Sequence, residues 1–168
     1  MRRPLSKRSR SWLGHLLLLI LIYWAVQAYQ GRDAADSGPA PPIEAIALNG
    51  EAISLQSLKG QPLLIYFWAT WCHICALTRD SIDNIAQDHP VITIASQSGE
   101  DYEIRSYIDE HNFSAIVIND RDNRLSQRYG VNAFPSVFVL DAKGEIDDVE
   151  IGLSSEWGLR LRLWLASF

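Results

Sequence analysis

The sequence predicts an α/β fold in which helices flank a mixed central sheet. Short apolar runs of strand length alternate with segments whose apolar residues recur at helical spacing, the pattern of parallel strands joined by helices. The chain then continues with two strands around a tight turn and a last helix, which adds antiparallel strands to the sheet. A hydrophobic segment near the N-terminus stands apart from this pattern.

Strands are expected where apolar residues run without interruption or flank a turn signal. A continuous apolar run such as Leu63–Trp68 indicates a strand that is buried on both faces. The dipeptide Asn49–Gly50 favours a tight turn and predicts an N-terminal β-hairpin in the folded domain. The expected strands cover residues 43–48, 52–55, 63–68, 91–95, 115–118, 137–140 and 145–151.

Helices are expected where apolar residues fall on one face. After Cys72 such residues recur at helical spacing as far as Asp88, and a proline follows shortly afterwards. The tail is also assigned to a helix, although its alternation of Leu and Arg would suit a strand, and Trp157 and Trp164 are expected to pack into the core from it. The expected helices cover residues 72–88, 101–111, 122–129 and 154–168.

The N-terminal segment predicts a membrane anchor. Residues 1–10 carry five positive charges and no acid, and residues 11–31 carry no formal charge. About 20 apolar residues span a bilayer as a helix, and a basic flank stays on the cytoplasmic side. We therefore expect a cytoplasmic segment at 1–10, one transmembrane helix at 11–31, a Pro-rich linker at 32–42 and a folded domain at 43–168. The domain would lie in the periplasm of a bacterium, tethered to the inner membrane.

A cleaved signal peptide is the alternative reading of the same segment. Val26 and Ala28 place small residues at the spacing that signal peptidase prefers. Both readings deliver the domain to the same oxidising side of the membrane.

The charge distribution excludes a nucleic-acid partner. The chain has 15 Lys and Arg against 20 Asp and Glu, and five of the basic residues lie within residues 1–10. The remainder therefore has ten basic and twenty acidic side chains. Phosphate contacts need clustered Lys and Arg, which this acidic body does not offer.

The two cysteines form a Cys72-His73-Ile74-Cys75 motif between a buried strand and a helix. Unpaired N–H groups and the helix dipole favour negative charge at a helix N-terminus, so the Cys72 thiol should ionise easily. The thiolate is the nucleophile in disulfide exchange. Cys75 lies one turn further on and can resolve the mixed disulfide. The catalytic candidates are therefore Cys72 for attack and Cys75 for resolution.

Other uses of a cysteine pair fit less well. A structural zinc site needs four ligands, and there is no second Cys pair or His-x₃₋₅-His segment. Covalent haem attachment needs a histidine where Ala76 stands. A purely structural bridge over so short a loop would remove little chain entropy. Copper(I) binding by the two thiolates stays open as the alternative function, although Met1 is the only methionine of the chain.

Two segments resemble the thioredoxin superfamily: Tyr66-Phe-Trp-Ala-Thr-Trp-Cys72, and Tyr129-Gly-Val-Asn-Ala-Phe-Pro-Ser136 with the strand that follows. The resemblance implies a thioredoxin fold in which residues 101–118 form an inserted α-β unit. It also implies a cis peptide bond before Pro135 and a substrate segment paired with the backbone of Phe134. The activity implied is thiol–disulfide exchange with cysteines of other proteins, with no cofactor beyond the cysteine pair.

The anchor, linker, hairpin and inserted unit look like the membrane-anchored TlpA/ResA-like branch. Ala95-Ser-Gln-Ser-Gly99 is similar to the suppressor-of-copper-sensitivity D proteins, which motivates the copper alternative and a role in copper tolerance. The chain departs from the superfamily at two positions, because Tyr66 and Thr78 stand where relatives carry a carboxylate near the second cysteine. The proton acceptor for Cys75 is therefore not identified.

Two further residues are expected to tune the site. Trp71 precedes the nucleophile and would shield the disulfide and contact substrate. His73 would donate to the Cys72 thiolate or stabilise it as a cation. The alternative is that His73 is simply an exposed side chain at a variable position. A membrane redox partner is expected for a tethered enzyme. An oxidant and a reductant share all of these residues, so the direction of electron flow is left open.

Overall fold

The computed structural model describes residues 15, 17–19, 21–22 and 37–168. The chain divides into two units, residues 1–32 and 33–168. The six described residues of the first unit are helical, and no helix within the described residues has the length and apolar character needed to cross a membrane. Most of the predicted anchor at 11–31 lies outside the described residues.

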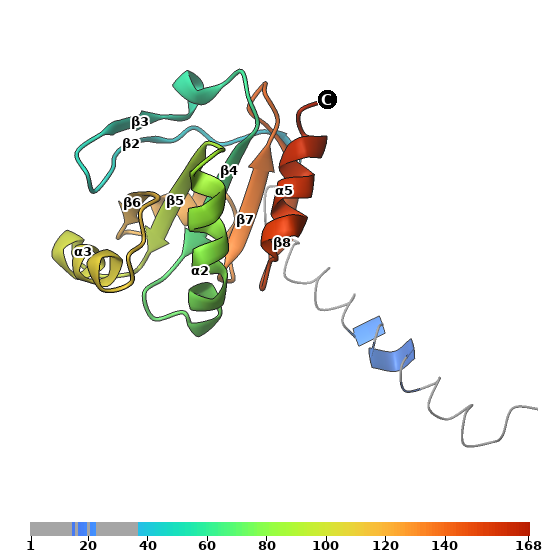
Figure 1. Ribbon diagram of the computed structural model, residues 1–168, viewed down its shortest axis with the longest axis horizontal. Helices are drawn as coiled ribbons and strands as arrows, with labels where there is room; N and C mark the ends of the chain where they lie inside the picture. The colour runs from blue at the N-terminus through green and yellow to red at the C-terminus, as the bar shows by residue number, and fades with distance from the viewer. Residues whose placement is uncertain (1–14, 16, 20, 23–36) are drawn as a thin grey trace, which may run out of the picture. The chain divides into compact units, whose positions relative to one another are not determined.

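The second unit is built on a six-stranded mixed sheet with the order β1-β8-β7-β4-β5-β6 (Figure 1). The strands β4, β5 and β6 are parallel, whereas β7 and β8 run antiparallel, as the sequence predicted. The strands of this sheet are β1 Gly38–Pro39, β4 Leu63–Trp68, β5 Val91–Ser96, β6 Ile116–Asp120, β7 Ser136–Leu140 and β8 Glu145–Ile151. The predicted hairpin forms a separate small sheet of β2 Glu44–Ile46 and β3 Ala52–Ser54.

Two apolar layers cover the sheet, one on each face. The helices α2, α3 and α5 bury Ile82, Ile104 and Leu163 against one face. The hairpin, the short helix η1 and the end of α4 cover the other face, where Ile53 and Tyr129 are buried. The helices are η1 Leu55–Leu58, α2 His73–Ala86, α3 Asp101–Glu110, α4 Arg124–Arg128 and α5 Glu156–Leu165. The thioredoxin-like α/β arrangement and the inserted α3–β6 unit match the expectation from the sequence.

The domain begins earlier in the chain than the predicted boundary at residue 43. Gly38 and Pro39 pair with β8 as an edge strand, and the Ala40 N–H donates to the Gly144 carbonyl at 3.1 Å. The Tyr129 hydroxyl donates to the carbonyl of Pro41 at 2.7 Å. A proline is tolerated in an edge strand because one side of that strand makes no ladder bonds. A Pro-rich composition therefore concealed a docked segment at the end of the predicted linker.

The prediction that Trp157 and Trp164 pack into the core is wrong. The side of α5 that faces the sheet carries Leu159 and Leu163, which are fully buried. Trp157 is 83% exposed and Trp164 is 57% exposed, because both lie on the opposite side of the helix. The helix is apolar on two faces, and a count of apolar residues does not say which face the sheet covers.

Candidate active site

The cysteine pair lies where β4 ends and α2 begins. Three residues connect the strand to Cys72, whose N–H donates to the Ala69 carbonyl at 3.1 Å and closes the turn. Cys72 has extended backbone angles and is the N-cap of α2. Its Sγ accepts a hydrogen bond from the Cys75 N–H at 3.2 Å. The sulfur thus occupies the position where unpaired amides at a helix start stabilise negative charge.

The two cysteines are joined in a disulfide and differ slightly in how exposed each residue is. The Cα atoms of Cys72 and Cys75 are 5.3 Å apart. Cys72 is 9% exposed, whereas Cys75 is 2% exposed and packs beneath it in the core layer of α2. An incoming thiolate therefore reaches Cys72 more readily than Cys75.

A loop ending in Pro135 lies beside this turn. The Phe134–Pro135 peptide bond is cis, as the resemblance implied. Because β7 pairs antiparallel with β4 and Ser136 lies opposite Phe67, the loop before β7 meets the turn after β4. The Pro135 carbonyl accepts a hydrogen bond from the Gly152 N–H at 2.8 Å, which fixes the loop to the end of β8.

Trp71 and Phe134 connect the turn to the loop. Their ring centroids are 5.7 Å apart in an edge-to-face arrangement, a geometry that aromatic quadrupoles favour. Trp71 is 57% exposed, and its indole Nε1–H donates to the Gln97 carbonyl at 3.1 Å. The structure therefore places both rings at the rim of the disulfide. His73 is exposed on the first turn of α2.

The segment after β5 supports the site, and sequence reasoning did not assign it this role. The Thr70 N–H donates to the Ser98 Oγ at 3.0 Å, and the Ser98 hydroxyl donates to the Ser96 carbonyl at 3.1 Å. Gln97 adopts a positive φ of 48° and offers its carbonyl to Trp71. The sequence did carry a signal for this role. Thr70 follows β4, and Gln97 and Ser98 follow β5, and the carboxyl ends of neighbouring parallel strands meet at one edge of a sheet.

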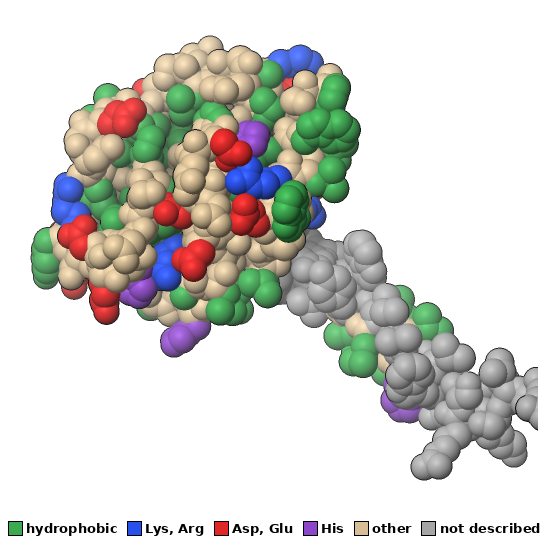
Figure 2. Space-filling model, viewed as in Figure 1, with side chains coloured by type: hydrophobic (Ala, Val, Ile, Leu, Met, Phe, Trp, Pro, Cys, Tyr) green, Lys and Arg blue, Asp and Glu red, His purple; other side chains and the backbone are tan. Residues whose placement is uncertain are grey.

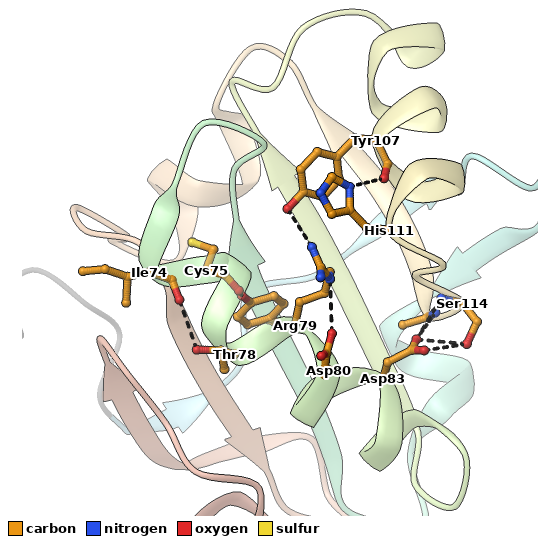
Figure 3. Close-up of polar contacts among 11 residues, drawn as sticks. Ile74, Cys75, Thr78, Arg79, Asp80, Asp83, Tyr107, His111 and Ser114 are labelled. Atoms are coloured by element: carbon orange, nitrogen blue, oxygen red, sulfur yellow. Dashed lines mark hydrogen bonds and ion pairs between the residues drawn. The ribbon is translucent and has the colours of Figure 1, made fainter.

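Tyr66 and Thr78, the two positions that lack the expected carboxylate, both contact the backbone of the first turn of α2. The Tyr66 hydroxyl donates to the Cys75 carbonyl at 3.2 Å in the buried layer. The Thr78 hydroxyl lies 3.5 Å from the Ile74 carbonyl (Figure 3). Burial and the nearby Tyr107 raise the pKa of Tyr66 above its ordinary value, while Arg79 opposes this shift. Tyr66 therefore stays protonated and acts as a hydrogen-bond donor to the backbone of Cys75.

Arg79 is a partly buried cation close enough to Tyr66 to act on its pKa. Arg79 lies one turn after Cys75 on α2, and its Nη1 is 3.4 Å from the Tyr107 hydroxyl (Figure 3). Tyr107 stacks on His111 with ring centroids 4.2 Å apart, and its carbonyl lies 2.8 Å from the His111 Nδ1. Sequence reasoning did not single out Arg79 or Tyr107, because α2 and α3 meet only in the folded domain. Within the described residues, no group of three or more His, Cys, Asp or Glu could hold a metal ion.

Residues 37–149 match the AhpC/TSA family. The chain belongs to this family. It is 35% identical to a thioredoxin-like protein of Haemophilus influenzae over 123 residues, which cover 72% of this chain and 73% of the relative. It is 26% identical to the thiol-disulfide oxidoreductase ResA of Bacillus anthracis over 151 residues, or 83% of this chain and 87% of that protein.

Solved structures agree on the fold. The exposed lipoprotein thioredoxin of Streptococcus pneumoniae superposes with a TM-score of 0.69 and 22% identity, covering 74% of this chain and 99% of that one. The family match and the relatives named as thiol-disulfide oxidoreductases identify this AhpC/TSA member as a thioredoxin-like thiol:disulfide oxidoreductase with a CxxC cysteine pair, and cysteine-containing proteins are its class of substrate.

Proposed function

We propose that the protein exchanges disulfides with substrate proteins outside the cytoplasm, with Cys72 as the attacking thiol and Cys75 as the resolving thiol. The observation that carries these roles is the N-cap position of the Cys72 Sγ, which accepts the Cys75 N–H and belongs to the more exposed of the two cysteines. Helix amides and the dipole stabilise the thiolate that attack requires.

In the reducing direction, the Cys72 thiolate attacks one sulfur of a substrate disulfide and forms a mixed disulfide. The other substrate sulfur leaves as a thiolate. The Cys75 thiolate then attacks the Cys72 Sγ, and the second substrate sulfur leaves. Two electrons pass to the substrate, and the Cys72–Cys75 disulfide is formed. The oxidising direction is the same sequence reversed.

The rim residues are proposed to receive the substrate segment. Pro135 and the backbone of Phe134 lie beside the turn that carries the nucleophile, and Trp71 contacts the Phe134 ring. An extended substrate segment would lie along this loop with its cysteine against Cys72. His73, exposed one residue after Cys72, would tune the thiolate as a donor or a cation.

The location is proposed from the sequence of the N-terminal segment. The basic residues 1–10 and the uncharged stretch 11–31 support a single span of the bacterial inner membrane with the domain in the periplasm. A membrane protein would then exchange electrons with the pair. Placing alkaline phosphatase after Arg32 tests this orientation: high phosphatase activity supports it, and low activity contradicts it.

We also propose that the chain is nearest in kind to the suppressor-of-copper-sensitivity D proteins. The stretch Ala95–Gly99 motivates this assignment, and its members Gln97 and Ser98 hold the active-site turn. Copper(I) binding is the alternative use of the same pair, since soft thiolates select Cu(I). Retention of stoichiometric Cu(I) by the reduced chain against a competing chelator would favour that alternative, and loss of the metal would remove it.

The assignment of roles is tested by two matched serine variants. Cys72→Ser should abolish exchange with a disulfide-bonded peptide, because no attacking sulfur remains. Cys75→Ser should still attack but accumulate the mixed disulfide, which is seen on a non-reducing gel. Full activity of Cys72→Ser, or accumulation in that variant instead, would contradict the proposal.

The direction of electron flow is decided by the reduction potential of the pair at equilibrium with glutathione. A value near about −120 mV is that of a strong oxidant, and a value near about −270 mV is that of thioredoxin. The first result would assign disulfide formation, and the second would assign reduction with electrons supplied across the membrane.

A further inference from the structure

The outward face of α5 is apolar. Its members are Trp157, Leu161, Trp164 and Leu165, together with Phe168, which follows the end of the helix, and they are between 53% and 91% exposed. The four helical members follow each other at spacings of four, three and one residues, which places them on one side of the helix. The Phe168 ring packs against Trp164 with ring centroids 4.9 Å apart. Figure 2 shows hydrophobic side chains gathered over this helix. We call this set the outer face of α5.

Charged residues of α5 lie at its flanks and bind the domain itself. On one flank, Arg160 reaches Asp88 at 2.7 Å and Glu156 at 2.9 Å. On the other flank, Arg162 pairs with Asp148 and Glu150 of β8. These contacts fix the rotation of α5 about its own axis. They leave no charge on the outer face, so the exposed aromatic rings are presented as a continuous apolar strip.

The short connection between the proposed anchor and β1 restricts which surfaces the outer face of α5 can reach. Only residues 32–37 separate the stretch 11–31 from β1, and six extended residues span about 20 Å. β1 pairs with β8, the strand to which Arg162 ties α5. The tether therefore enters the domain at the sheet edge that carries α5. A short tether also gives a high local concentration of lipid, so a weak surface affinity is enough for docking.

From these observations we propose that the outer face of α5 lies in the interface of the lipid bilayer and holds the domain on the membrane surface. The proposal rests on the membrane anchorage proposed above. Tryptophan favours the headgroup level because its ring is apolar and its N–H is polar. A helix that lies in this interface buries an apolar face and keeps its charges to the sides and rear, as α5 does.

Docking would set the direction in which the active site faces. Asn84 binds Glu156 and Asp88 binds Arg160, so α2 and α5 run parallel with their N-termini toward the same end. The disulfide lies at the N-terminus of α2. With α5 flat on the bilayer, the disulfide would face along the membrane rather than away from it, toward substrates or redox partners held at the same surface.

The test uses tryptophan quenching in the full chain, reconstituted in phosphatidylcholine vesicles with brominated acyl chains, which quench on contact. Replacing both Trp157 and Trp164 by Phe should lower the quenched fraction of the emission, because two quenched residues are lost. Trp71→Phe is the matched control, since Trp71 is 57% exposed like Trp164 but lies at the disulfide. Its loss should raise the quenched fraction.

The proposal is decided by whether the double variant lowers or raises the quenched fraction of the emission. If the double variant raises the quenched fraction as Trp71→Phe does, α5 does not meet lipid, although the anchor that carries Trp12 and Trp24 does. If the wild-type chain shows no quenching, the anchorage itself is wrong. Thiol–disulfide exchange with a soluble peptide is measured in parallel and separates either result from a failure of the proposed enzyme activity.

A charge in the middle of the strip provides a second test. Leu161→Glu should lower the quenched fraction below that of the double variant, because Trp157 and Trp164 would leave the lipid and still emit. Exchange with a soluble peptide should be unchanged. Tyr102→Glu is the control, because Tyr102 is 70% exposed on α3 and away from α5. A detergent-solubilised dimer that Leu161→Glu dissociates, together with unquenched Trp157 and Trp164, would show that a second copy covers the strip and would overturn the proposal.

Discussion

The helices α2 and α5 lie side by side on one face of the sheet, yet they differ in how clearly the sequence describes them (Figure 1). α2 begins at the reactive cysteine and buries Cys75, Thr78, Ile82 and Ile85 along one stripe. Its exposed apolar residues, Ile74 and Leu77, are confined to its first two turns beside the disulfide. α5 buries Leu159 and Leu163 but presents a second apolar stripe outward. Where one stripe exists, periodicity identifies the core. Where two exist, only the neighbours of the helix decide between them.

The largest expected effect separates the two faces of α5. Leu163→Ala should lower the free energy of unfolding by about 2–4 kcal/mol, because it leaves a cavity in a fully buried layer. Leu161→Ala, two residues earlier on the outer face, should change it by less than about 0.5 kcal/mol. Urea unfolding in detergent, away from any bilayer, measures both. Equal losses would mean that the outer face is covered within the protein.

A smaller effect is expected where α2 begins. Tyr66→Phe removes the hydroxyl that donates to the Cys75 carbonyl and should lower the free energy of unfolding by about 1 kcal/mol. The rate of peptide disulfide exchange should be unchanged, because the protonated phenol is not the acceptor for the Cys75 proton. A Tyr66→Phe variant with normal stability but a slow resolving step would instead give the hydroxyl a role in proton transfer.

The smallest effect concerns the contact between the two helices and depends on pH. Hydrogen bonds from Arg160 hold the pKa of Asp88 below its ordinary value, and those from Asn84 and Arg160 lower the pKa of Glu156. A lowered pKa means that the unfolded chain binds more protons, so this stabilisation is complete above about pH 5 and is lost as the pH falls below about 4. The Tm deficit of Arg160→Gln should therefore shrink on acidification.

The other flank of α5 should show the opposite sign. Burial raises the pKa of Glu150 even though Arg162 and the Ser154 hydroxyl favour its charged form. A raised pKa makes the folded protein bind protons more tightly, so this contribution is present at low pH and is lost as the pH rises through the raised value. Glu150→Gln should therefore raise the Tm relative to wild type at neutral pH more than at pH 4. A larger gain at low pH would reverse the assignment.

The proline loop opposite the cysteine pair was implied by the resemblance to the thioredoxin superfamily. The sequence by itself determined the order of strands and helices and the position of the cysteine pair at a helix start. These features rest on local signals: apolar period, turn residues and a short motif whose chemistry depends on its own helix. A strand such as β4 is apolar at every position, so burial on both faces could be expected without knowing its neighbours.

Tertiary structure alone decided the contacts between segments that are distant in the chain. The parallel neighbours β4 and β5 end at the same edge, which brings Gln97 and Ser98 to the active-site turn. The edge of β8 recruits Gly38 and Pro39 from the predicted linker. The ion pairs of Arg160 and Arg162 fix which apolar side of α5 meets the sheet. Periodicity specifies that a helix has apolar faces, whereas the geometry of its partners decides which of them is buried.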